Sequence, residues 1–112
     1  MNIAARKAQE KEGLKRAILN AARELFLERG YDRTSMRMIA QRIAYSPTTI
    51  YIYFKDKNAI FHALHVEAFQ QLGARLAPLA HVENPMERLT AMGKVYLEFA
   101  EQNPGLYDLM FI

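Results

Sequence analysis

The side chains with the clearest chemical potential lie in one short stretch, Ser46 to Lys57, which reads SPTTIYIYFKDK. Its alternating β-branched and aromatic residues are typical of a β-strand. However, Ser46 followed by Pro47 is a common helix start, because serine caps the first turn and proline needs no hydrogen bond there. The sequence offers no second strand, and a lone strand would leave its backbone groups unpaired. We therefore predict a helix over residues 46–54.

A helix over this stretch would separate two kinds of side chain. Ile50 and Phe54 lie four residues apart on one face and are predicted to be buried. The opposite face carries hydroxyls, methyl groups and a ring without any charge: Thr48, Thr49, Ile52 and Tyr53. Tyr51 lies between the faces, where its ring can pack or its hydroxyl can reach a phosphate. Such a face suits a DNA major groove, where hydroxyls bond base edges and phosphates and methyl groups contact thymine.

Basic residues surround this uncharged face in the sequence. They are Arg33, Arg37, Arg42, Lys55 and Lys57. Cations placed around a helix of this kind are typical of contacts that hold a phosphate backbone while the helix reads the bases. Each of them could equally be an ordinary solvated side chain.

Three helices are predicted around this stretch. Apolar residues at spacings of three and four predict a first helix from about Lys11 to Arg29, with Gly30 as a cap in the left-handed region, and the polar residues 1–10 are expected to form a flexible basic arm. Thr34 or Ser35 can cap a second helix that ends near Ala44. The buried stripe predicted for the second helix is Met36, Ile39, Ala40 and Ile43. Two short helices joined by a tight turn form a helix-turn-helix unit.

The remaining residues predict further helices. Asp56 is expected to cap a fourth helix that runs to about Leu79 and buries Ile60, Ala63 or Leu64, Phe69 and Leu72. Pro85 opens a fifth helix with Leu89, Met92, Val95, Tyr96 and Phe99 inside, and residues 106–112 start a sixth. The fold class is therefore all-α: a three-helix helix-turn-helix domain over residues 11–57, followed by the first helices of a second helical domain over 58–112.

Composition narrows the possible functions. Residues 1–57 hold 12 basic and 6 acidic side chains, whereas residues 58–112 hold 3 basic and 6 acidic ones, so only the front half is suited to meet a polyanion. The chain has no cysteine, which suits a reducing cytosol, and we expect neither a signal peptide nor a membrane-spanning segment. We expect no enzyme, catalytic residue, cofactor or metal site, because His62 and His65 have no convincing third ligand in the sequence.

The stretch from about residue 14 to residue 64 resembles the DNA-binding domain of the tetracycline-repressor-like (TetR) family of transcriptional regulators. The resemblance is carried by three motifs in a fixed order: the end of the first helix (Ala22, Leu25, Phe26, Gly30, Tyr31), TSMRMIA (residues 34–40), and SPTTIYIYF followed by a lysine (residues 46–54 and Lys57). Residues 85–112 resemble the start of that family's regulatory domain more loosely. The family usually has glycine where this chain has Ala44, which would cost about 1 kcal/mol if Ala44 is left-handed.

The resemblance implies a cytoplasmic bacterial or archaeal protein, associated with the nucleoid, that acts as an effector-responsive repressor and binds a palindromic double-stranded DNA operator as a homodimer. Together with the residue patterns it predicts the following DNA contacts: Thr34, Arg37, Ser46, Pro47, Thr48, Thr49, Tyr51, Tyr53, Lys55 and Lys57. A pocket for a small apolar effector is predicted among Met92, Tyr96, Phe99, Tyr107 and Met110, where the alternative is plain core. The competing hypothesis is a helical interaction module whose basic first helix binds a membrane surface or a protein partner.

Overall fold

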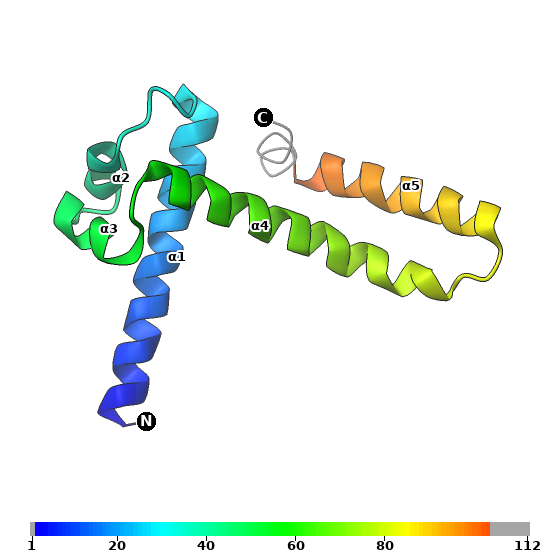
Figure 1. The fold of residues 1–112 in the computed structure, drawn as a ribbon, viewed down its shortest axis with the longest axis horizontal. Helices are drawn as coiled ribbons and strands as arrows, with labels where there is room; N and C mark the ends of the chain where they lie inside the picture. Colours follow the sequence, from blue (N-terminus) through cyan, green and yellow to red (C-terminus); the bar gives the residue numbers. More distant parts are fainter. Residues whose placement is uncertain (1, 104–112) are drawn as a thin grey trace. The chain divides into compact units, whose positions relative to one another are not determined.

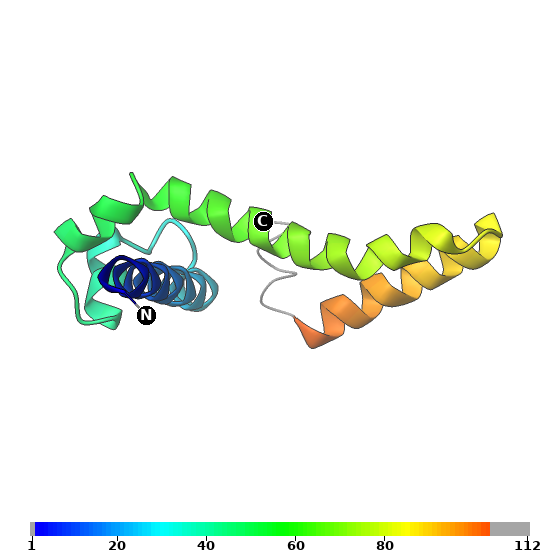
Figure 2. The same cartoon turned by 90° about the horizontal axis from the view of Figure 1, so that it is seen from below.

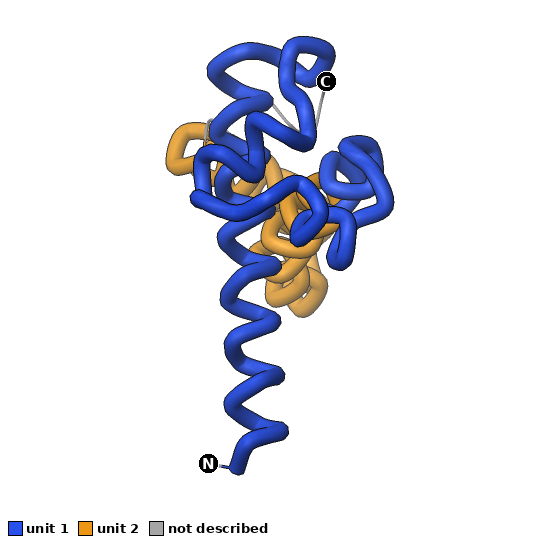
Figure 3. Tube along the Cα trace, turned by 90° about the vertical axis from the view of Figure 1, so that its left-hand side faces the viewer, with its two compact units in different colours: residues 1–63 blue, residues 64–112 orange. Residues whose placement is uncertain are grey.

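The computed structural model describes residues 2–103, and all regular elements in that part are helices (Figure 1). They are α1 (Ile3–Arg29), α2 (Met36–Arg42), α3 (Pro47–Tyr53), α4 (Lys57–Leu76), the short 3-10 helix η1 (Ala77–His81) and α5 (Pro85–Gln102). The chain divides into two compact units, residues 1–63 and 64–112 (Figure 3). The predicted sixth helix lies outside the described residues. None of the described helices is both long and apolar enough to cross a membrane.

The front unit holds the three helices predicted to surround the site. α2 packs against both α1 and α3, and the two short helices lie together on one side of α1 (Figures 1 and 2). Their apolar faces form a common interior whose members include Ile18, Ala22, Leu25, Phe26, Met36, Ile39, Ala40, Ile50, Phe54 and Ile60. An aromatic cluster then fixes the end of α1 to the start of α4, because the Phe61 ring lies 5.5 Å from Phe26 and 4.8 Å from Tyr31 between centroids.

The start of α1 corrects the prediction of a flexible basic arm before a helix at about Lys11. The helix begins at Ile3, and the Asn2 side chain caps it by accepting a hydrogen bond from the Ala5 N–H at 2.7 Å. Alanine, arginine, lysine, glutamine and glutamate favour helix even where no apolar stripe is present. Arg6 also pairs with Glu10 one turn later, at 3.9 Å. Periodicity detects buried helix faces only, and this part of α1 is exposed.

Two residues of the front unit have a positive φ. Gly30 ends α1 with φ 89° and ψ 158°, so its positive φ agrees with the prediction, but its ψ is extended and lies outside the left-handed helical region. Ala44, in the turn between α2 and α3, has φ 60°. A non-glycine residue pays about 1 kcal/mol for this conformation. Of the two alternatives for this turn, Ala44 therefore takes the left-handed conformation.

Among the described residues of the rear unit, 64–103, the interior is much smaller. Ala68, Leu72 and Phe99 form its buried cluster, with Leu76 and Tyr96 packed against them. Phe69 and Leu89, both predicted to be inside, are 48% and 63% exposed, and Met92 is exposed as well. α5 carries apolar side chains on more than one face, so periodicity alone could not show which face is buried. α4 also ends at Leu76, before the predicted Leu79, because Pro78 supports a 3-10 turn there.

Candidate nucleic-acid interface

Local hydrogen bonds set the start of α3 as the sequence predicts. The Ser46 hydroxyl accepts from the Thr49 N–H at 3.4 Å, and Pro47 occupies the first turn. At the other end, Ile50 and Phe54 are buried and hold the helix against the front unit. The predicted helix is therefore confirmed, and its orientation follows from two buried side chains on one face.

The outer face of α3 consists of the side chains that this orientation leaves accessible. Thr48, Tyr51 and Ile52 are exposed, Ile52 to 72% and Tyr51 to 53%. Thr49 and Tyr53 are half-buried, and the Thr49 hydroxyl lies 3.1 Å from the Ser46 hydroxyl. The two threonines therefore differ, because Thr48 presents an open hydroxyl and methyl group whereas Thr49 shares its hydroxyl with the helix cap. We call this set the α3 outer face.

Two of the predicted cations are accessible near this face. Arg37 is exposed on α2, and Lys55 is exposed in the link between α3 and α4. An exposed, solvated cation can exchange its water for a phosphate at low cost, so both remain suitable phosphate ligands.

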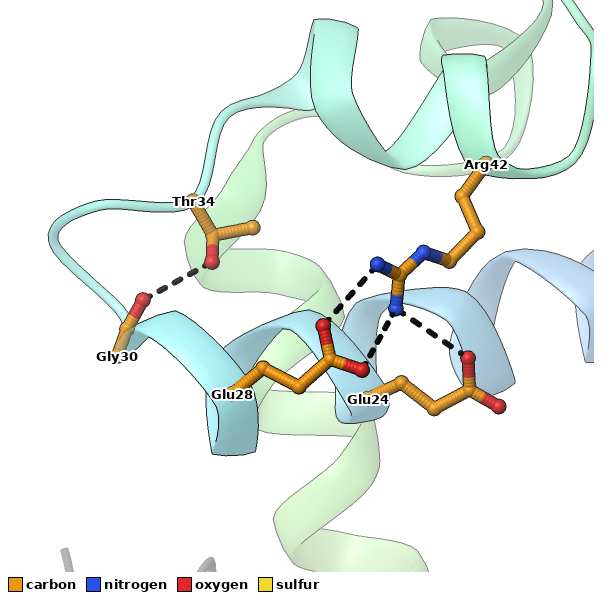
Figure 4. A network of polar contacts seen from close by, with 5 residues as sticks. All are labelled: Glu24, Glu28, Gly30, Thr34 and Arg42. Carbon is orange, nitrogen blue, oxygen red and sulfur yellow. Dashed lines mark hydrogen bonds and ion pairs between the residues drawn. The ribbon is translucent and has the colours of Figure 1, made fainter.

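Arg42 is engaged elsewhere. Its guanidinium forms two hydrogen bonds to the Glu28 carboxylate, at 3.0 and 3.1 Å, and approaches Glu24 at 3.5 Å (Figure 4). The hydrogen bond from Arg42 lowers the pKa of Glu28, and the same bond raises the pKa of Arg42. This network ties α2 to α1. Arg42 is therefore a poor candidate for the phosphate contact that its position suggests.

Thr34 is not accessible for the contact predicted for it. Its side chain is 2% exposed, and its hydroxyl donates to the Gly30 carbonyl at 2.9 Å (Figure 4). Ser35 is the residue that caps α2, accepting from the Met38 N–H at 3.1 Å. Thr34 therefore closes the loop between α1 and α2 from inside, and we leave it out of the interface.

Lys57 is held by a partner that sequence reasoning missed. Its ammonium donates to the Tyr31 carbonyl at 2.7 Å and lies 4.1 Å from the centroid of the Tyr31 ring. The residue is half-buried, and Asp56 beside it caps α4 as predicted, accepting from the Ala59 N–H at 2.8 Å. Lys57 and Tyr31 lie 26 positions apart, so only the folded chain reveals that this lysine joins the start of α4 to the loop after α1.

With this geometry in place, the chain can be compared with known proteins. The family described as "Bacterial regulatory proteins, tetR family" matches residues 18–64, which hold α2, α3 and the residues that orient them. Residues 18–64 of the chain belong to the tetR family.

Individual relatives are named as helix-turn-helix (HTH) transcriptional regulators. The chain is 40% identical over 60 residues to the HTH-type transcriptional repressor Rv1474c of Mycobacterium tuberculosis, covering 54% of this chain and 32% of that protein. It is 41% identical over 58 residues to the HTH-type transcriptional regulator UidR of Escherichia coli K12, covering 52% and 30%. The chain thus spans about a third of the length of these curated relatives.

A solved tetR-family structure extends the likeness to the rear unit. PfmR from Thermus thermophilus matches with a TM-score of 0.73 at 29% identity, covering 83% of this chain and 51% of that one. A TetR-like regulator from Rhodococcus sp. RHA1 matches with a TM-score of 0.76 at 26% identity, covering 86% and 53%. The fold of the described helices is therefore that of the family.

The predicted effector pocket is not assembled by the described part of this tetR-family chain. Phe99 is buried in the rear cluster, Tyr96 packs against that cluster, and Met92 is exposed. Tyr107 and Met110 lie outside the described residues. An open depression of about 370 Å³ on α5 is lined by other residues: Met86, Glu87, Thr90, Ala91 and Lys94. The pocket stays a prediction.

Proposed function

We propose that this chain binds duplex DNA in a sequence-dependent way and regulates transcription, with the α3 outer face placed in the major groove. The observation that carries the proposal is the contrast between the two sides of α3. Ile50 and Phe54 are buried, whereas the exposed side carries hydroxyls, a methyl-rich isoleucine and tyrosine rings without a charge. Water-facing helices are ordinarily filled with lysine, glutamate and glutamine. A base-reading helix instead needs the groups found here.

Each accessible residue has a role that follows from its chemistry. Thr48 and Ile52 are one helical turn apart, so both can approach bases, Thr48 through its hydroxyl and Ile52 through contact with thymine methyl groups. Tyr51, Tyr53, Arg37 and Lys55 supply hydroxyls and cations for phosphates. Ser46, Pro47 and Thr49 mainly set the start of the helix, and the Thr49 hydroxyl adds a second, less open donor.

The finer parts of the proposal concern the whole regulator. We propose a homodimer that binds a palindromic operator in the cytoplasm, with half-site centres about 34–36 Å apart or a multiple of that distance. Residues from 58 onward would begin the domain for dimerisation and for a small apolar effector. Release of DNA by the effector would make the protein a repressor, which is what the printed name of the relative Rv1474c says of that protein.

Selection of bound sites from random duplex DNA tests this proposal. The selected site then serves to compare Thr48→Ala with Thr90→Ala, since Thr90 is an exposed threonine on α5 and belongs to the other compact unit. Loss of one base contact costs about 1–3 kcal/mol, so Thr48→Ala should weaken binding to the selected site by about 5- to 150-fold. Random duplex should be bound as before, and Thr90→Ala should change neither affinity. Equal behaviour of the two variants on the selected site would refute the proposal.

A further inference from the structure

The face of α1 that is buried in the front unit continues toward the N-terminus as an exposed face. Ile18, Ala22 and Leu25 are buried on one face of α1. Steps of three and four residues toward the N-terminus continue this face through Lys15, Lys11 and Lys7. The same side of the helix thus changes from apolar residues to three lysines, and all three are exposed. We call these three residues the α1 lysine row.

The lysine row begins beside the end of α3. The Lys15 ammonium lies 6.0 Å from the centroid of the ring of Phe54, the residue that ends α3. From there the N-terminal part of α1 projects away from α2 and α3 (Figures 1 and 3). Lys11 and Lys7 therefore lie about one and two turns beyond Lys15 on the same face of α1.

The positive charge of the row is available for a partner. Glu10 and Glu12 flank the row without interrupting it, and Glu10 pairs with Arg6 at 3.9 Å. Within the described residues, no ion pair of Lys7 or Lys11 is found. The row is about 12 Å long, and a DNA strand places a phosphate about every 3.4 Å along its axis. Its length therefore matches a run of three to four phosphates.

We propose that the α1 lysine row, through Lys7 and Lys11, binds the phosphate backbone of duplex DNA beside the groove that α3 enters. This inference rests on the proposed function and adds a second contact surface to it. The contact has no base specificity, because an ammonium bound to phosphate carries no sequence information. A membrane surface fits the row less well, because interfacial helices need a broad apolar face, whereas Ile3 and Leu14 are the large apolar residues of this part.

Two double variants of the full chain test the inference. Lys7→Gln with Lys11→Gln removes two charges from the row. Arg6→Gln with Arg16→Gln removes the same charge from exposed positions on the other side of the same helix. Glutamine keeps length and helix propensity, so equal helical circular dichroism will show that both variants fold. Binding to the selected duplex and to random duplex is then measured against salt concentration.

The lysine variant should reduce the slope of log affinity against log salt by about 1.8, and affinity at 0.1 M salt should fall at least about tenfold on both duplexes. The arginine variant should change the slope by less than about 0.5. Equal losses in the two variants would overturn the inference and leave the proposed function standing. Absence of wild-type binding to any duplex would defeat the proposed function itself. Binding to phosphatidylserine vesicles that depends on Lys7 and Lys11, with an unchanged DNA slope, would assign the row to membranes instead.

Discussion

The outer faces of α3 and α5 look alike by exposure alone, but they differ in what lies beneath them. Ile52 on α3 is 72% exposed and Met86 on α5 is 70% exposed. Beneath α3, Ile50 and Phe54 are buried in the large common interior of residues 1–63. Beneath α5, Phe99 is the buried residue of the helix, and within residues 64–103 its buried cluster adds Ala68 and Leu72.

This difference indicates that exposed apolar area identifies a base-reading surface only under two conditions. The helix must be held rigidly, and its exposed face must combine apolar groups with hydrogen-bonding groups. The α3 outer face combines methyl groups with hydroxyls on a helix that is fixed by its cap and by two buried residues. The large apolar side chains that α5 exposes are leucines and methionines, which supply contact area without directional bonds. We therefore place base recognition on α3 and assign no base-reading role to α5.

The largest expected effect concerns the small buried cluster beneath α5. Phe99→Ala removes the largest member of the rear cluster and should destabilise residues 64–103 by about 3–5 kcal/mol. Hydrogen exchange should show fast exchange in α5, while α2 and α3 keep their protection and random-duplex affinity is retained. Leu97→Ala is the matched control, because Leu97 is exposed and should cost less than about 0.5 kcal/mol. Equal loss of protection in α3 would show that the two units depend on one core.

Sequence reasoning succeeds where local rules decide the structure. The caps at Ser35, Ser46 and Asp56 and the buried pair of Ile50 and Phe54 follow from patterns that span only a few residues. The all-α fold and the helix-turn-helix unit are predictable for the same reason, and the family likeness covers this region.

Sequence reasoning does not identify the partner of a side chain that has two possible ones, or the buried face of a helix that has two apolar faces, and the DNA contacts of Thr34 and Lys57 stay predictions. The types and positions of Lys57 and Arg42 predict phosphate ligands, but Tyr31 and Glu28 hold them in the folded chain. Thr34 is predicted to contact DNA, although its hydroxyl is satisfied by the Gly30 carbonyl inside the loop. These hydrogen-bond partners lie 4 to 26 residues away along the chain. The type of a single residue does not show whether its polar group will bind such a partner or water.

The two residues with a positive φ, Gly30 and Ala44, test how the turns of the front unit contribute to its stability. Gly30→Ala should cost about 1–3 kcal/mol, because φ 89° with an extended ψ is nearly restricted to glycine. A methyl group would meet no atom within 4 Å there, so the cost is conformational. Ala44→Gly should instead gain about 0.5–1 kcal/mol by relieving the left-handed conformation at φ 60°. Urea unfolding measures both, and changes of the same sign would contradict this reading of the turns.

A comparison of Lys57 with Lys55 distinguishes a lysine that stabilises the fold from one that binds DNA phosphate. Lys57→Met keeps an apolar stem over the Tyr31 ring but removes the hydrogen bond to the Tyr31 carbonyl, so stability should fall by about 1 kcal/mol. The salt slope of DNA binding should stay unchanged. Lys55→Met, at an exposed position, should leave stability unchanged and lower the slope by about 0.9. The reverse pattern would return Lys57 to the phosphate role that the family resemblance implies.

The smallest effect concerns the Arg42–Glu28 pair, which ties α2 to α1 at an exposed position. Because the pKa of Glu28 is lowered in the folded chain, the pair stabilises the protein above the ordinary carboxyl pKa of 4.5, and this contribution is lost as pH falls through the lowered value. Arg42→Gln should therefore lower the melting temperature slightly at pH 7, and the difference should vanish on acidification once Glu28 is protonated. High salt should shrink it at neutral pH as well. A difference that persisted after Glu28 is protonated would mean that Arg42 stabilises α2 through the packing of its aliphatic stem, and the charge would then have no part in holding the helix-turn-helix unit to α1.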